Sequence, residues 1–169
     1  RVQQQRRTEE DHRSFAIEAQ KKENALIHCA QWITSTAGSS PASNPFSMLP
    51  EPLVFPVRLF TVTLIPAKTH PMPALDAVTD LITEVFDEIG GKVFLHTHED
   101  EICGLISNES LVASGRTLDK KLARLQRQVT TYFLDAPVII YHDKPISLAE
   151  LRQGYQLCED SKALAFYVG

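Results

Sequence analysis

Residues 93–105, with the sequence VFLHTHEDEICGL, hold most of the side chains in this chain that could do chemistry. His96, His98 and Asp100 follow the spacing H-x-H-x-D. Alternate side chains of a β-strand point to the same face, so a strand here would bring the three together. Imidazoles and carboxylates are zinc ligands, and a catalytic zinc needs at least three of them around an open position. The pattern predicts a metal site at His96, His98 and Asp100, with a metal-dependent hydrolase as one candidate function.

This spacing resembles the metal motif of the metallo-β-lactamase superfamily, and the following Ile-Cys-Gly-Leu resembles that family's continuation. The chain departs from the family at Glu101, which stands where the family has its next histidine, and His142 is the one later histidine. Glu101 would also lie on the opposite face of the strand. We therefore expect any metal bound here to be weak, and we predict neither a cofactor nor a catalytic residue.

The elements that must position this segment follow a regular order of apolar patterns. Strands are predicted at residues 57–65, 92–97, 101–107 and 137–141, and helices at residues 74–89, 118–135 and 147–166. Strand, helix, strand, strand, helix, strand is the split βαβ order, which folds as an antiparallel sheet with both helices on one face. The chain is thus predicted to be α+β with a ferredoxin-like core and an extra C-terminal helix, begun by a Ser147 and Glu150 capping box.

A split βαβ core with carboxylates at the tip of its hairpin resembles the GGDEF domain family, whose active members condense two GTP molecules into cyclic di-GMP. The resemblance spans roughly residues 57–169. The residues that stand in place of Gly-Gly-Asp-Glu-Phe are His98, Glu99, Asp100, Glu101 and Ile102. By this resemblance Asp100 and Glu101 match the acidic pair of the family.

The departures from that family concern the residues that its catalysis needs. Residues 66–69 hold no carboxylate where the family has a second metal ligand, and His98 and Glu99 replace the hairpin glycines. Residues 90–93 also lack the Arg-x-x-Asp motif of its product-inhibition site. A two-metal clamp requires both ligands, so the chain is predicted not to be an enzyme, although a divergent nucleotide cyclase remains an alternative.

Residues 1–36 contain no proline and are rich in strong helix formers, which predicts one long N-terminal helix. Its apolar heptad positions predict a seam for a coiled-coil homodimer, and docking of the same stripe on the chain's own domain is the alternative. The seam residues are Phe15, Ala19, Leu26, Cys29 and Ile33. Residues 37–56 include five prolines and predict a linker, part of which lies against the domain because it is unusually apolar.

A long helix, a linker and a degenerate GGDEF-like domain over residues 57–169 together resemble the central region of AraC-type two-component response regulators of the YesN-like kind. The residues near the end that carry this similarity are Tyr155, Ala163, Leu164, Phe166, Tyr167 and Gly169. The resemblance implies a non-catalytic module for signal coupling and dimerisation in a bacterial transcriptional regulator. Its partners would be a second copy, and the receiver and helix-turn-helix DNA-binding domains of a longer chain.

The composition narrows the remaining function classes. Seventeen Lys and Arg against 21 Asp and Glu give a net charge of -4, which disfavours direct nucleic-acid contact by this piece. No apolar run approaches the roughly 20 residues that span a bilayer, so no membrane contact and a cytoplasmic location are expected. Three widely spaced cysteines predict reduced, packed thiols. The first residue, Arg1, and the apolar last residues suggest that both ends are cut from a longer chain.

Overall fold

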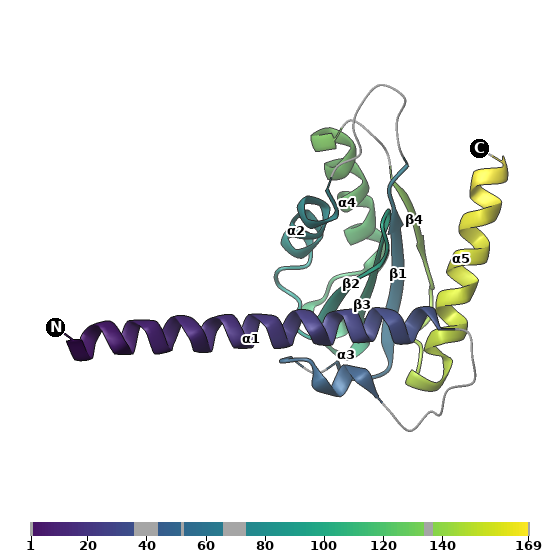
Figure 1. The fold of residues 1–169 in the computed structure, drawn as a ribbon. Coiled ribbons are helices and arrows are strands. Elements are labelled where there is room, and N and C mark those ends of the chain that lie inside the picture. Colours follow the sequence, from purple (N-terminus) through teal and green to yellow (C-terminus); the bar gives the residue numbers. More distant parts are fainter. Residues whose placement is uncertain (1, 36–43, 52, 66–73, 134–136, 169) are drawn as a thin grey trace.

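A computed structural model describes residues 2–35, 44–51, 53–65, 74–133 and 137–168, with side chains from residue 9 to residue 163 (Figure 1). Its sheet has the strand order β2-β3-β1-β4, and every neighbouring pair is antiparallel. The strands are β1 (Val57–Thr63), β2 (Lys92–His98), β3 (Glu101–Ser107) and β4 (Val138–Tyr141). The predicted α+β class, with an antiparallel sheet and an N-terminal helix, is confirmed.

One face of the sheet is covered by α2 (Leu75–Val85) and α4 (Leu118–Phe133), as Figure 1 shows. Their apolar residues recur at helical spacing and pack on the β1 and β3 side chains that point to this face. Gly104 of β3 is required here, because a Cβ at this position would overlap the buried ring of Phe60. The Ile-Cys-Gly-Leu run is therefore explained by packing between the sheet and its helices.

The other face is covered by α1 (Val2–Thr34), by the short 3-10 helix η1 (Pro45–Met48) and by α5 (Leu151–Val168). Sheet residues such as Leu59, Leu95 and Leu105 form a second core with these elements. Both faces of β1 are thus buried, which is typical of a strand with a nearly continuous apolar sequence. The molecule has three layers, because α1 joins the extra C-terminal helix on the face opposite α2 and α4 (Figure 1).

The residues of the predicted seam of α1 are buried near the C-terminal end of the helix and exposed closer to its N-terminal end. Cys29 and Ile33 are buried in the chain's own core, and Leu26 packs partly buried against it. Phe15 and Ala19 lie on the exposed part of α1, which projects beyond the sheet (Figure 1). The prediction of one continuous self-association seam is therefore wrong for Cys29 and Ile33, since the sheet and α5 already cover them. For this end of the helix, docking on the chain's own domain is the alternative that holds.

Two other features differ from the predictions. Ser147 makes no side-chain cap, and a 3-10 turn, η2 (Leu148–Glu150), precedes α5, so the predicted capping box is absent. An unpredicted helix, α3 (Asn108–Ser114), follows β3 and ends at Gly115 with a φ of 71°. The prediction that part of the linker lies against the domain is confirmed, since Phe46, Leu49 and Leu53 belong to the second core. Residues 36–43, 52, 66–69 and 135, on which other predictions fall, lie outside the described residues.

The three cysteines are free and buried, as predicted. Burial raises the pKa of the Cys29 thiol to about 11 and that of Cys158 to about 12, so both stay protonated and unreactive near neutral pH. In the described ranges, no helix is both long and apolar enough to pass through a membrane.

Candidate functional site

A β-bulge in β2 separates the two histidines of the H-x-H-x-D pattern. His96 is paired with Ile102 and His98 with Glu101, so Thr97 is an extra residue between them. His96 Nε2 lies 2.8 Å from Thr79 Oγ1 on α2, whereas His98 Nε2 lies 3.8 Å from Glu159 Oε2 on α5. These helices cover opposite faces of the sheet, so the predicted metal site of His96, His98 and Asp100 is not assembled. That prediction was wrong because strict alternation ends at the bulge.

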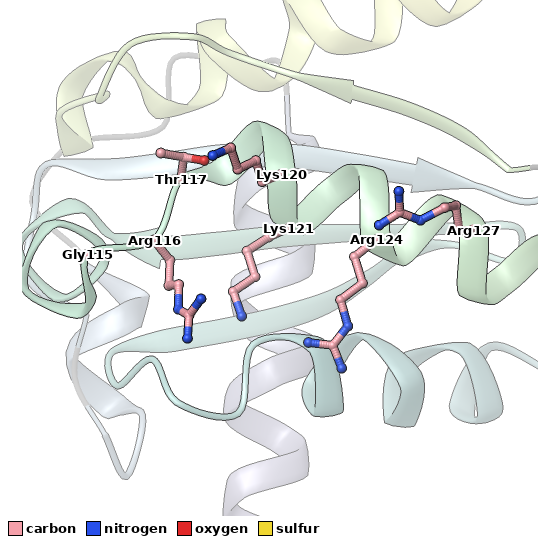
Figure 2. A pocket seen from close by; sticks show the side chains of 7 residues that line it. All are labelled: Gly115, Arg116, Thr117, Lys120, Lys121, Arg124 and Arg127. Carbon is pink, nitrogen blue, oxygen red and sulfur yellow. The ribbon is translucent and has the colours of Figure 1, made fainter.

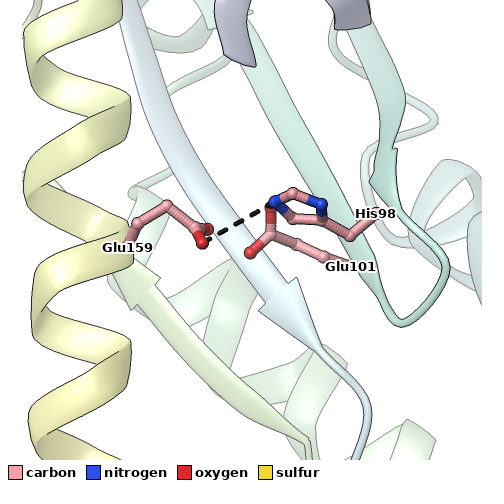
Figure 3. Close-up of side chains that lie close together, drawn as sticks. All are labelled: His98, Glu101 and Glu159. Carbon is pink, nitrogen blue, oxygen red and sulfur yellow. Dashed lines mark ion pairs between the residues drawn. The ribbon is translucent and has the colours of Figure 1, made fainter. Parts of the chain in front are cut away.

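The predicted hairpin residues also take different positions. Glu99 and Asp100 form the turn between β2 and β3, where Glu99 is exposed and Asp100 is half-buried. Ile102 is buried in the core with α2 and α4. His98 and Glu101 instead face α5, although alternation predicted that they would lie on opposite faces (Figure 3).

Glu101 is fully buried and lies in a polar group that we call the Glu101 cluster. Its members are Thr97, His98, Glu101, Tyr155, Glu159 and Lys162. The Thr97 and Tyr155 hydroxyls donate to Glu101 Oε1 over 2.5 and 2.6 Å, and Lys162 Nζ donates to Oε2 over 2.9 Å. The cluster thus joins the end of the β2–β3 hairpin to the middle of α5.

The predicted site residues do not include Tyr155, Glu159 or Lys162, although the sequence carries a signal for them. Tyr155, Glu159 and Lys162 are spaced i, i+4 and i+7, which places polar groups along one face of α5. The sequence predictions include Tyr155 only as a residue on one side of the last helix and as part of the resemblance to response regulators. The other residues of that resemblance add little, because Ala163 is exposed and the side chains of residues 164–169 lie outside the described residues.

The two carboxyl groups of the cluster have opposite electrostatics. Burial alone would raise the pKa of Glu101, but hydrogen bonds from its neighbours, Glu159 and Lys162 foremost, hold it at about 2. Burial, followed by the hydrogen bond and charge of Glu101, raises the pKa of Glu159 to about 7. Near neutral pH, Glu101 is therefore ionised while Glu159 is partly protonated.

The Glu101 cluster contains side chains that could bind a metal ion, but the ammonium of Lys162 already neutralises their negative charge. One ligand atom from each of His98, Glu101 and Glu159 lies within 4.8 Å of the others. However, the Lys162 ammonium lies 2.9 Å from Glu101 and 3.1 Å from Glu159, so it supplies the positive charge that a metal would supply. A divalent ion would have to displace this ammonium, and the geometry best fits an ion-pair connection between the hairpin and α5.

This connection predicts that stability falls as pH rises from about 5 to about 8. The folded-state pKa of Glu159 lies above its unfolded value, so its contribution is fully present below the unfolded pKa and is lost as pH rises through about 7. Relative to Glu159→Gln, the free energy of unfolding of the wild type should drop by about 1–3 kcal/mol over this range. Urea unfolding of both proteins at several pH values measures it. A constant difference between the two would show that Glu159 does not titrate in this range.

His96 lies apart from this cluster, in a groove of about 270 Å³ between α1, α2 and β2. The Thr79 hydroxyl donates to the Leu75 carbonyl over 2.7 Å, so it accepts its bond from His96 Nε2. His96 is thus held as a hydrogen-bond donor at the rim of the groove.

Comparisons with protein-family models, curated proteins and solved structures found no match to this chain.

Proposed function

We propose that this chain is a non-catalytic regulatory module that couples its N-terminal helix to its C-terminal helix within a bacterial DNA-binding transcriptional regulator. The observation that carries the proposal is the direct packing of α1 on α5 in one core. A change in the position of one helix must repack the other, because protein interiors are close-packed.

Trp32 is the side chain that most directly joins the two helices. The Arg152 guanidinium of α5 lies 4.1 Å from the centroid of the Trp32 ring, in the geometry of a cation–π contact. The same ring packs edge-on against Phe46 of η1, with centroids 5.6 Å apart. Trp32 therefore ties α1 to both the segment that follows it and the last helix.

The part of α1 that projects beyond the sheet is exposed and can contact a second copy of the chain. Phe15 is 76% exposed, and Ala19 is exposed one turn further along. We assign homodimer contacts to this part of α1, with a receiver before the module and a helix-turn-helix domain after it, as the resemblance to AraC-type response regulators implies. The buried, free cysteines are in keeping with a cytoplasmic location.

The hairpin favours regulation over catalysis. The strand order β2-β3-β1-β4 supports the ferredoxin-like, GGDEF-like core that we propose. Glu101, which matches a family acidic residue, bonds Tyr155 and Lys162 in the core instead of facing a substrate. Its carboxylate serves to connect the hairpin to α5.

The proposal is tested by rotating α1. A dimeric coiled coil fused before residue 1 should impose a different rotation on α1 when one residue is inserted at the junction, because each residue turns a helix by about 100°. We expect hydrogen exchange in α5 to differ between the direct fusion and the one-residue insertion. A seven-residue insertion is the matched control, since a heptad restores the facing of the seam.

The readout separates coupling from local damage. If α5 exchanges identically in all three fusions while α1 stays helical, the two helices are uncoupled and the proposal fails. If the seven-residue control differs from the direct fusion as much as the one-residue insertion does, the effect comes from length instead of rotation, and the proposal also fails.

A further inference from the structure

The side of α4 that faces solvent carries a strongly cationic groove of about 270 Å³, which we call the α4 groove (Figure 2). Two lysines and three arginines contribute five positive charges to it, although the whole chain has a net charge of -4. The groove is lined by Gly115, Arg116, Thr117, Lys120, Lys121, Arg124 and Arg127. In Figure 2 the side chains of Lys121 and Arg124 on α4, and of Arg116 just before it, extend in the same direction, whereas those of Lys120 and Arg127 extend from other sides of the helix.

This arrangement is unfavourable for an isolated helix. Lys120 and Arg124 are four residues apart, and Arg124 and Arg127 are three apart, so like charges adjoin along the helix surface. Lys120 and Lys121 also stand in the first turn, at the positive end of the helix dipole. An anion bound between these side chains would relieve both repulsions.

The chain itself supplies little negative charge to the groove. Glu88 pairs with Arg116 at 3.5 Å and with Lys121. Within the described residues, no ion pair joins a carboxylate to Lys120, Arg124 or Arg127. Asp119, in the first turn of α4, interacts electrostatically with Lys120, so Arg124 and Arg127 are the exposed cations that remain for a ligand.

Lys121 gives the groove a fixed floor. Its side chain is only 8% exposed, and its ammonium donates to the Val85 carbonyl over 3.0 Å and to Glu88. These two bonds fix the position of the ammonium, so its charge stays beside the groove. A buried, positioned charge beneath exposed guanidinium groups is a recognisable arrangement for phosphate, which guanidinium groups bind in a bidentate manner.

We propose that the α4 groove binds a small phosphate-bearing ligand with at least two negative charges, such as a diphosphate or triphosphate group. The volume lies just below the roughly 300–1,000 Å³ of sites that enclose drug-sized ligands, which fits a phosphate chain and little more. Binding through this groove does not depend on the function proposed above, because the groove lies on the face opposite α1 and α5.

Titration calorimetry with inorganic pyrophosphate, tripolyphosphate and sulfate at constant ionic strength tests the proposal. We expect tripolyphosphate to bind most tightly and sulfate least. The double variant Arg124→Gln/Arg127→Gln should weaken tripolyphosphate binding by about tenfold or more, since it removes two charge-assisted contacts. Both positions are exposed, so the variant should keep the circular dichroism spectrum of the wild type.

The matched control is Arg13→Gln/Lys22→Gln, which removes the same charge from the exposed part of α1. It should leave tripolyphosphate binding nearly unchanged. If both double variants weakened tripolyphosphate binding equally, the effect would come from net charge alone and the proposed site would be contradicted. Tripolyphosphate binding no tighter than sulfate, or displacement of tripolyphosphate by a lower concentration of mixed-sequence DNA, would also contradict it. Equal affinity for tripolyphosphate and adenosine triphosphate would assign recognition to the phosphate chain, and tighter nucleotide binding would support a nucleotide as its source.

Discussion

Replacing Ile33 by aspartate should remove most of the stability of this domain. Ile33 is 1% exposed and packs in the core that joins α1 to the sheet and α5. Truncating a buried isoleucine costs about 2–5 kcal/mol, and a buried carboxylate adds a desolvation cost. We expect a loss of at least about 4 kcal/mol, against the 5–15 kcal/mol that is typical of a whole domain. Urea unfolding followed by circular dichroism measures it.

The contrasting variant is Phe15→Asp, on the same helix but 76% exposed. It should change the free energy of unfolding by no more than about 0.5 kcal/mol, while lowering the sedimentation mass at high concentration through loss of the proposed dimer contact. If Ile33→Asp instead dissociated a dimer and left the free energy of unfolding unchanged, the packing of α1 on the sheet of its own chain would be contradicted. A mass unaffected by Phe15→Asp would move any dimer interface away from this residue.

This pair of variants addresses a choice that the sequence left open. The stripe that includes Leu26, Cys29 and Ile33 has the same apolar spacing whether its partner is a second helix or the chain's own sheet. Apolar periodicity predicts that one face of the helix is buried, but it does not indicate which surface covers that face. The sheet and helices themselves were predictable, because their periods of 2 and 3.6 residues are properties of local sequence.

The candidate site was less predictable, for a geometric reason. The H-x-H-x-D pattern assumes strict alternation, and one extra residue at Thr97 turns His98 toward α5 and away from the face of His96. None of the residue types near Thr97 predicts a β-bulge at this position. The sequence predicts Glu101 only as the match to a family acidic residue, since its partners Tyr155 and Lys162 lie more than 50 residues away in sequence.

Replacing Lys162 by methionine should cost about 3 kcal/mol of stability at neutral pH. Methionine keeps most of the apolar stem and removes the ammonium that lies 2.9 Å from Glu101 Oε2. Glu101 is fully buried, and breaking a buried ion pair from one side leaves an uncompensated charge, which typically costs 3–5 kcal/mol. Lys144→Met, at an exposed position, is the matched control and should cost little.

A second substitution identifies the charge as the cause. Adding Glu101→Gln to Lys162→Met removes the stranded carboxylate while retaining an amide that can accept from Tyr155 and Thr97. The double variant should therefore be more stable than Lys162→Met alone. The double-mutant cycle should give a coupling energy of about 1–3 kcal/mol between the two positions. If the two losses simply add, the ion pair contributes nothing beyond packing.

The pH dependence gives an independent check on the same cluster. In the wild type, the pKa of Glu101 lies below its unfolded value, so its contribution is present above the unfolded pKa and is lost as pH falls through about 2. Without Lys162, burial should raise that pKa above the unfolded value, so stability would instead fall as pH rises. The loss caused by Lys162→Met should then already be present near pH 4 and should grow further towards pH 7. A loss of equal size at both pH values would mean that Lys162 stabilises the fold through its hydrocarbon stem, and that Glu101 does not depend on its ammonium.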